Sequence, residues 1–246
     1  MKMQFMSKRL GVVTVGFAML SAVGMAQAQT AGSNVISVGW LHAAPQNQST
    51  PLTVNSINGM PVNLVETGSG FAAEKTDTLG FTFAHYFTDD ISVEAVAGYP
   101  NYLKFEGTGT LSSFGVLGKA KPIAPIILLR YHFFDAQTKF RPYVGLGVNY
   151  TKFIDAQVSN NDFVTSKIGP GGSATVHATS SWSPAFSAGA NYAIDDHWSL
   201  GLSVSYVPVK TTATLTGTTA GGTVIDSTAT LKIRPVITFL NVGYRF

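Results

Sequence analysis

The chain has 246 residues, of which 45% are hydrophobic and only 12% are charged. Soluble domains carry about 25% charged residues, so we predict that much of the surface does not face water. The formal net charge of +3 comes from residues 1–28, which hold Lys2, Lys8 and Arg9 and no acidic residue. The remaining chain is neutral, which excludes the strongly basic surface of a nucleic-acid-binding protein.

Residues 1–28 have the order of a secretory signal peptide. A basic start is followed by an apolar run from Leu10 to about Met25 and by the small-residue site Ala26-Gln27-Ala28. An uncleaved membrane anchor fits less well, because the run is short and is interrupted by glycine and serine. We expect cleavage after Ala28, which leaves 29–246 as the exported domain. Since the chain has no cysteine, disulfides and thiol chemistry are excluded.

Beyond Ala28, no run approaches the roughly 18 apolar residues of a membrane helix. Apolar residues instead recur with period two, which indicates strands with two different faces. Eight segments show this pattern: about 35–42, 79–84, 91–98, 126–133, 144–151, 184–194, 198–206 and 236–246. The clearest is 198–206, where bulky apolar residues alternate with serine and glycine.

The connections between these segments alternate in length. Short ones are expected at 88–90, 134–139 and 195–197, and long loops at about 43–75, 107–123, 155–180 and 211–227. This organisation predicts an all-β fold: an eight-stranded antiparallel transmembrane β-barrel, an up-and-down meander in the outer membrane of a Gram-negative bacterium. A soluble periplasmic β-domain is the alternative, but it would place charges on the exposed face of its strands.

The interior of an eight-stranded barrel is nearly filled by side chains, so no wide pore is expected. Five polar residues have the parity of the inner face and are predicted to form a network there: Glu94, Arg130, Asn149, Asn191 and Arg245. A buried charge without a partner is costly, so we predict that Glu94 pairs with an arginine.

Four stretches carry a resemblance to a known family. They are LGFTFAHYFTDDISVEAVAGYP, PIILLRYHF, KFRPYVGLGVNYTKF and the terminal GYRF. In this order and spacing the sequence resembles the outer-membrane protein W (OmpW) family of small barrels. The resemblance implies a narrow apolar pocket at the outer end, from which small hydrophobic molecules escape sideways into the membrane. It places Val96 on the pocket floor, where the family has leucine, and Trp182 in the pocket.

Apolar residues also flank the expected long loops, among them Leu103, Phe105 and Phe153. Such residues mark either a ligand pocket or the outer girdle of a barrel. For Trp182 and Phe153 both interpretations stay open, whereas for Leu103 and Phe105 the girdle is favoured. In barrels similar to this one, a terminal aromatic is read by the assembly machinery, which assigns that role to Tyr244 and Phe246.

No pattern of catalytic residues emerges. The pairs Asp89-Asp90 and Asp195-Asp196 fall in short turns, where turn formation explains them better than catalysis. The histidines lack the spacing of metal ligands, so neither a metal nor a cofactor is predicted.

We therefore expect a monomeric barrel, not an enzyme, with outer-membrane lipid, small hydrophobic solutes and the barrel assembly machinery as partners. It would bind such solutes at its extracellular end and pass them into or across the outer membrane. The alternative is a structural or surface-interaction protein whose long loops bind phage, bacteriocin or host.

Overall fold

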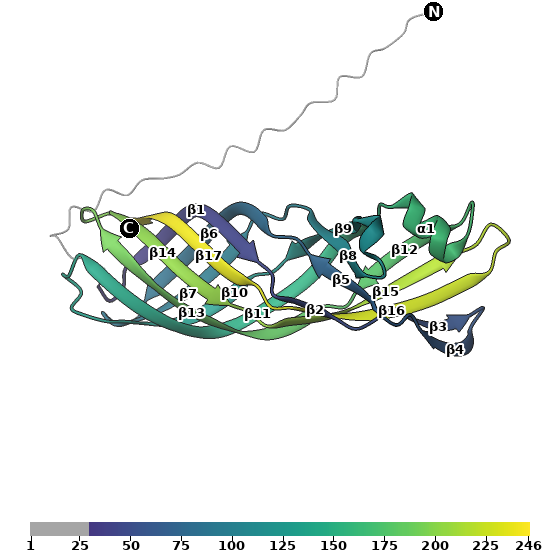
Figure 1. Cartoon of the computed structure of the whole chain (residues 1–246). Coiled ribbons are helices and arrows are strands. Elements are labelled where there is room, and N and C mark those ends of the chain that lie inside the picture. The colour runs from purple at the N-terminus through teal and green to yellow at the C-terminus, as the bar shows by residue number, and fades with distance from the viewer. Residues whose placement is uncertain (1–29) are drawn as a thin grey trace, which may run out of the picture.

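The computed structural model describes residues 30–246, so the predicted signal peptide lies outside the described residues. The regular secondary structure of these residues is almost entirely β-strand (Figure 1). The exceptions are a short helix, α1 (Asn161–Ile168), and one 3-10 turn, η1 (Ser112–Phe114). Within 30–246, no helix is long and apolar enough to cross a membrane.

Eight strands form a closed antiparallel barrel, as predicted. Each pairs with the next along the chain, and the last pairs with the first, from Val35 opposite Arg245 to Ala44 opposite Val236. The strands are β1 (Asn34–Ala44), β6 (Thr76–Tyr86), β7 (Ile91–Gly98), β10 (Ile126–His132), β11 (Phe140–Val158), β13 (Ser181–Ala193), β14 (Trp198–Tyr206) and β17 (Val236–Arg245). The up-and-down meander is therefore confirmed.

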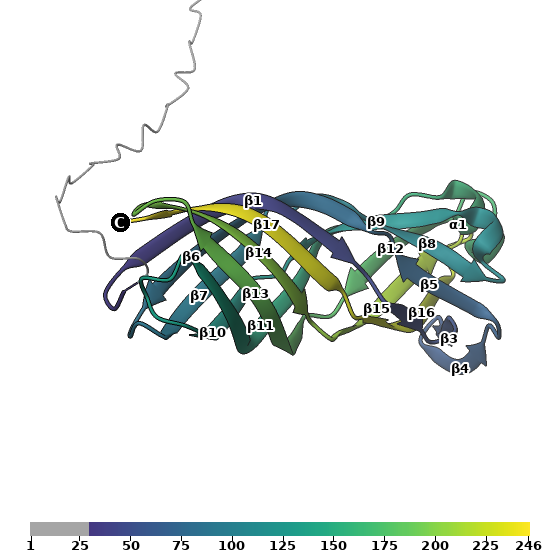
Figure 2. The same ribbon diagram turned by 60° about the vertical axis from the view of Figure 1, so that its left-hand side comes forward.

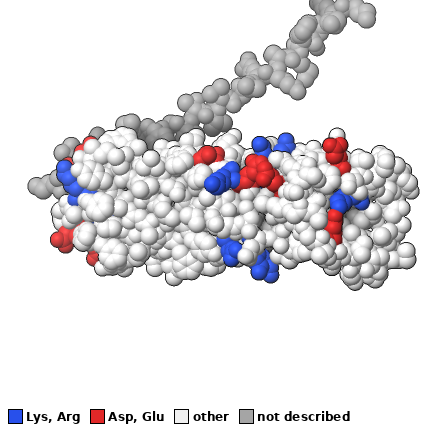
Figure 3. Space-filling view, viewed as in Figure 1, with Lys and Arg blue, Asp and Glu red and all other residues white. Residues whose placement is uncertain are grey.

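The two faces of the barrel wall differ as the period-two pattern predicts. On β14, Leu202 points outward with 52% of its surface exposed, whereas Ser203 and Ser205 are buried. In the view of Figure 3, the surface between the left-hand end and the middle is nearly free of charged residues. Such an uncharged band suits contact with the hydrocarbon core of a membrane.

Small residues on the inner face make room for larger neighbours. Gly80 lies beneath the ring of Phe239, and a Cβ at this position would come within 2.5 Å of that ring. Gly145 lies opposite Arg130, whose Cγ would be 3.2 Å from an added Cβ. Gly145 therefore makes room in the lumen for the Arg130 side chain.

Short turns close one end of the barrel, at residues 87–90, 133–139 and 194–197. In the last of these, the Asp195 carboxylate accepts hydrogen bonds from the backbone N–H groups of His197 and Trp198, both at 2.8 Å. These bonds favour the ionised form and lower the pKa of Asp195. This aspartate thus shapes a turn, as the sequence predicts.

The expectation of long loops is wrong, because most of these segments continue as strands beyond the barrel (Figure 2). We call this region the extension. Its strands are β2 (Asn47–Ser49), β3 (Thr53–Ile57), β4 (Met60–Val65), β5 (Ser69–Ala73), β8 (Leu103–Gly109), β9 (Val116–Ile123), β12 (Ser173–Ala178), β15 (Val209–Thr218) and β16 (Val224–Ile233). Threonine and glycine hide this strand pattern in the sequence, since they are also loop formers.

The extension has two sheets that meet along β2 and β5. Strands β9, β8 and β5 continue from the outer half of β11, while β12, β15, β16, β3 and β4 form the second sheet. Side chains join the two: the amide group of Asn47 donates to and accepts from the backbone of Ala73, at 2.8 and 3.0 Å. Ser49 Oγ accepts from the N–H of Phe71 at 2.8 Å. The sheets therefore enclose a common interior.

Leu202→Arg tests the assignment of the outward face. Because the new charge would lie in hydrocarbon, we expect it to lower the free energy of unfolding by about 2–4 kcal/mol. Urea unfolding in lipid vesicles measures this quantity. The matched control is Thr175→Arg, on an exposed position of β12 in the extension, which should cost less than about 0.5 kcal/mol. Equal costs at both positions would contradict the assignment.

Candidate functional site

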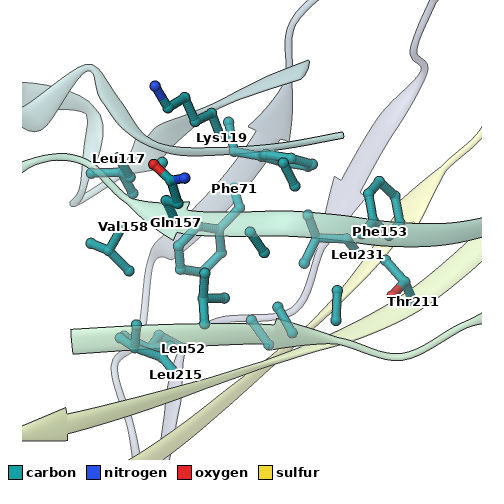
Figure 4. A pocket seen from close by; sticks show the side chains of 18 of the residues that line it. Leu52, Phe71, Leu117, Lys119, Phe153, Gln157, Val158, Thr211, Leu215 and Leu231 are labelled. Atoms are coloured by element: carbon teal, nitrogen blue, oxygen red, sulfur yellow. The ribbon is translucent and has the colours of Figure 1, made fainter. Parts of the chain in front are cut away.

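Two cavities lie one above the other along the barrel. The outer cavity, in the extension, has a volume of about 110 Å³ and is lined almost entirely by apolar atoms. Figure 4 shows Phe71, Leu52, Leu215 and Leu231 around it, while the polar ends of Lys119 and Gln157 point away. This lining provides an environment for an apolar molecule and offers few hydrogen bonds.

The inner cavity, of about 150 Å³, lies at the outer end of the eight-stranded barrel. Val96, Leu103 and Ile126 line it, and Arg130 forms part of its lower boundary. Phe153 lines both cavities, so its ring lies between them.

Four of the five predicted pocket residues line these cavities: Val96, Leu103, Phe105 and Phe153. Leu103 and Phe153 are buried, so neither belongs to an exposed girdle. The girdle interpretation that the sequence favoured for Leu103 and Phe105 is therefore wrong. Both face inward because the strand that carries them, β8, forms part of the wall of the extension.

The placement of Trp182 in the pocket is also wrong. Trp182 is 73% exposed and packs on Tyr150, with the ring centroids 4.9 Å apart. Ser183 and Ala185 lie on the opposite face of β13 from Trp182, and both are buried. Strand alternation fixes Trp182 on the outside, where a tryptophan suits the membrane interface.

A buried ion pair lies below the inner cavity. The Arg130 guanidinium forms a salt bridge with the Glu94 carboxylate, and the two residues are 6% and 5% exposed. The same guanidinium lies over the ring of Tyr143, 4.2 Å from its centroid. The prediction that Glu94 pairs with an arginine is confirmed. Together these side chains fill the lumen at this level.

The other three residues of the predicted network lie at different levels of the barrel. Asn149 donates to the carbonyl of Pro125 at 3.0 Å, near the outer end of β10. Asn191 pairs with Arg141 in the β11–β13 ladder, and Arg245 donates to the carbonyl of Asp196 in a periplasmic turn. The prediction of a single network of five residues is therefore wrong. Shared parity places residues on the same face of the barrel wall, but it does not place them at the same height along the barrel.

Sequence reasoning missed the cluster that fills the periplasmic end. Arg141 is 1% exposed and donates to the carbonyls of Asp89 and Phe134, at 2.7 and 3.2 Å. His132 is fully buried and lies 2.8 Å from the hydroxyl of Ser92, measured from Nε2 to Oγ. Arg141 has the same parity on β11 as Tyr143 and the inward Asn149, and this was the signal that could have revealed the first of these residues.

The wall beside the inner cavity has a gap in its backbone pairing. The β7–β10 ladder reaches its outer end at Val96 opposite Ile126, and the β8–β9 ladder begins at Leu103 opposite Ala120. Among the described residues, no backbone pair joins 97–102 to 121–125. This gap contains three prolines, which lack the N–H needed for a ladder. Tyr99, Asn101, Pro122 and Ala124 line the cavity there.

The lining of the cavities suits binding by shape and exclusion of water. Across residues 30–246, no group of three or more His, Cys, Asp or Glu residues is placed to hold a metal ion. Arg130, the charged residue in the lining of the inner cavity, is engaged by Glu94.

The closed eight-stranded barrel, its uncharged outward band and its short turns at one end define a β-barrel protein of the outer membrane of Gram-negative bacteria. Small barrels of this class differ in what their outer end encloses, and in this protein it encloses two cavities. Residues 30–246 match the OmpW family, and the chain belongs to that family.

Individual relatives agree with this assignment. Outer membrane protein W of Vibrio cholerae serotype O1 is 32% identical over 235 residues, which cover 94% of this chain and 97% of that protein. The crystal structure of OprG from Pseudomonas aeruginosa superimposes with a TM-score of 0.76 at 27% identity, covering 89% of this chain and 98% of OprG. A Pseudomonas aeruginosa protein named dibenzothiophene metabolism operon protein PahQ is 26% identical over 179 residues, covering 73% of this chain and 76% of PahQ.

Glu94→Gln tests the role of the buried ion pair. Because it leaves the Arg130 charge buried without a counterion, we expect the free energy of unfolding to fall by about 3–5 kcal/mol. Denaturant unfolding in vesicles provides the measurement. The double variant Glu94→Gln/Arg130→Met removes both charges and should regain most of the loss. If Glu94→Gln alone unfolds like the unchanged protein, the pair does not stabilise the lumen.

Proposed function

We propose that this barrel binds small hydrophobic molecules at its extracellular end and passes them into the outer membrane, without a chemical step. The observation that carries the proposal is the outer cavity, whose lining is almost entirely apolar although it lies in the water-exposed extension. An apolar chamber at this place favours molecules that leave water readily.

The volumes of the cavities indicate the size of the solute. A cavity of about 150 Å³ lined by apolar side chains stays dry and holds benzene or xenon. The inner cavity has this volume, about 150 Å³, and the outer cavity is smaller, about 110 Å³. Single aromatic rings and short alkanes fit these dimensions. A larger solute would have to displace Phe153, which separates the two spaces.

The route onward is proposed to be lateral. The Arg130–Glu94 pair and Tyr143 fill the lumen below the inner cavity, and the Arg141 and His132 cluster fills it again near the periplasmic turns. An apolar solute would have to displace buried charges on this path, which is costly. A solute that leaves through the gap between residues 97–102 and 121–125 does not have to break a ladder hydrogen bond.

The name of one relative supports the same class of solute. PahQ is named after an operon for the metabolism of dibenzothiophene, an apolar polycyclic aromatic molecule. For this chain we infer only the class, namely small apolar organic molecules. The inferred absence of enzymatic activity belongs to the same proposal, as do a monomeric state and an assembly signal at Tyr244 and Phe246.

A second function, surface interaction, is favoured by one observation. The β3–β4 hairpin projects from the outer end (Figures 1 and 2), and β4 exposes four large apolar residues: Met60, Val62, Leu64 and Val65. An exposed apolar edge strand is suited to pair with another chain. Deletion of residues 55–64 should abolish attachment of a protein partner but leave solute binding unchanged.

Solute binding can be measured with an introduced tryptophan. The three tryptophans of the chain, Trp40, Trp182 and Trp198, all face outward and would not report on the cavities. In a variant with these three changed to Phe and with Phe153→Trp, we expect fluorescence to change saturably as toluene or hexane is added. No saturable change with either solute would contradict the proposal.

Filling the outer cavity should weaken this binding. Ala213→Phe places a ring inside it, since Ala213 belongs to its lining, and should lower the affinity by about tenfold or more. Thr214→Phe, on the opposite face of β15, is the matched control and should have no effect.

The lateral route has its own test. Cysteines introduced by Asn101→Cys and Ala124→Cys would be the only thiols of the chain and flank the gap in the wall. Bridging them with a short bismaleimide should slow transfer of bound toluene into the vesicle membrane and leave its affinity unchanged. Each single-cysteine variant treated with the same reagent is the control. Unchanged transfer after bridging would favour a route through the lumen.

A further inference from the structure

The charges of this neutral chain are separated along the barrel. Residues 30–246 contain thirteen basic and thirteen acidic side chains, and Figure 3 shows many of the visible ones gathered around the middle of the molecule. We define the basic belt as Lys75, Lys104, Lys119, Lys121, Lys152, Lys210, Lys232 and Arg234. Four acidic residues lie beside them on the same strands or next to these strands: Glu74, Asp77, Glu106 and Asp155. The belt is therefore positive, whereas the turns and the outer tip are both negative.

Register places the belt just outside the membrane-facing band. Lys152 follows Tyr150 on β11, two residues beyond the contact of Tyr150 with the exposed Trp182. Lys210 and Lys232 lie one position beyond the pair Val209 and Ile233, where the extension begins. Because tryptophan and tyrosine mark the membrane interface, these ammonium groups lie at the depth of lipid headgroups.

Two pairs of lysines in the belt lie directly opposite one another on neighbouring strands. Lys104 is the cross-strand partner of Lys119 in the β8–β9 ladder. Lys210 is the cross-strand partner of Lys232 in the β15–β16 ladder, and both are exposed. Like charges directly opposite in a sheet are destabilising. An anion placed between the two lysines of each pair would remove this repulsion.

Of the four lysines in these pairs, only Lys104 has a carboxylate partner within the belt. Asp155 is 2.8 Å from the ammonium of Lys121, and Glu74 is 3.9 Å from that of Lys104. Among residues 30–246, no carboxylate lies within 4.0 Å of the ammonium groups of Lys119, Lys210 or Lys232. Lys119 and Lys121 both approach the ring of Tyr102, at 4.6 and 4.7 Å from its centroid, which gathers two charges at one place.

We propose that the two cross-strand lysine pairs, Lys104 with Lys119 and Lys210 with Lys232, bind phosphate groups of the phosphorylated glycolipid of the outer leaflet. A phosphate between two ammonium groups accepts charge-assisted hydrogen bonds from both and removes their repulsion. The pairs lie on different strands of the extension, so two lipid molecules fix the depth of the barrel in the membrane. This inference is independent of solute binding, because Lys104, Lys210 and Lys232 line neither cavity and the ammonium group of Lys119 points away from the outer one (Figure 4).

Lipid A, a glucosamine disaccharide lipid with two phosphates, is the probe for this site. The folded protein in phosphatidylcholine nanodiscs is titrated with lipid A, and the bound lipid is counted by native mass spectrometry. We expect two molecules to bind with higher affinity than any others. Lipid A stripped of its phosphates should bind more weakly, and inorganic phosphate at the same concentration should not displace the intact lipid.

Three variants locate the two sites. Lys104→Gln/Lys119→Gln and Lys210→Gln/Lys232→Gln should each remove one bound lipid, with affinity at that site falling about fivefold for each lysine lost. Lys104→Arg/Lys119→Arg retains the charge and should retain binding. Lys139→Gln, in a periplasmic turn, is the control for loss of charge alone. Gel mobility before and after boiling verifies that each variant is folded.

Two results would overturn the proposal. One is equal affinity for lipid A and for its dephosphorylated form, which would leave only contact with the acyl chains. The other is unchanged lipid binding in both Gln double variants that have passed the folding check.

Discussion

The structure depends on one constraint: in hydrocarbon, every backbone N–H and C=O group must find its partner within the protein. The pairing of β17 with β1 meets it by closing the sheet, and the chain ends where that strand ends. Closure divides every strand into two faces. The outer face must be apolar, so the polar residues of the spanning strands are confined to a narrow lumen, where they must satisfy one another.

The same constraint explains where the barrel is blocked and where it is open. Glu94 and Arg130 can be buried because each supplies the countercharge of the other, and the pair fills the lumen above the Arg141 cluster. Toward the outer end, the strands reach the membrane interface at Tyr150 and Trp182, and beyond it their pairing is no longer compulsory at every residue. The inner cavity and the gap between 97–102 and 121–125 lie between the ion pair and this outer end, and the outer cavity and the lysine pairs lie beyond the barrel.

Eight strands, their order and the residues facing lipid could be predicted because alternation is a local property of a strand. The pairing of Glu94 with an arginine could be predicted for the same reason, since Glu94 and Arg130 both have inward parity and carry opposite charges. The extension could not, because its strands use threonine, glycine and serine, which do not distinguish a strand from a loop. Trp182 was misplaced by the resemblance, although its own alternation with Ser183 and Ala185 assigned it to the outside.

The sequence by itself thus determined the class of protein, the closed barrel and the face on which each residue of a spanning strand lies. Only the tertiary structure decided which residues meet: that Arg245 caps a turn instead of joining Glu94, that Phe153 separates two cavities, and that lysines distant in sequence lie opposite one another. The reason is physical. Side-chain alternation fixes direction, whereas height along the barrel depends on the register between strands, which hydrogen bonding across the whole closed sheet sets.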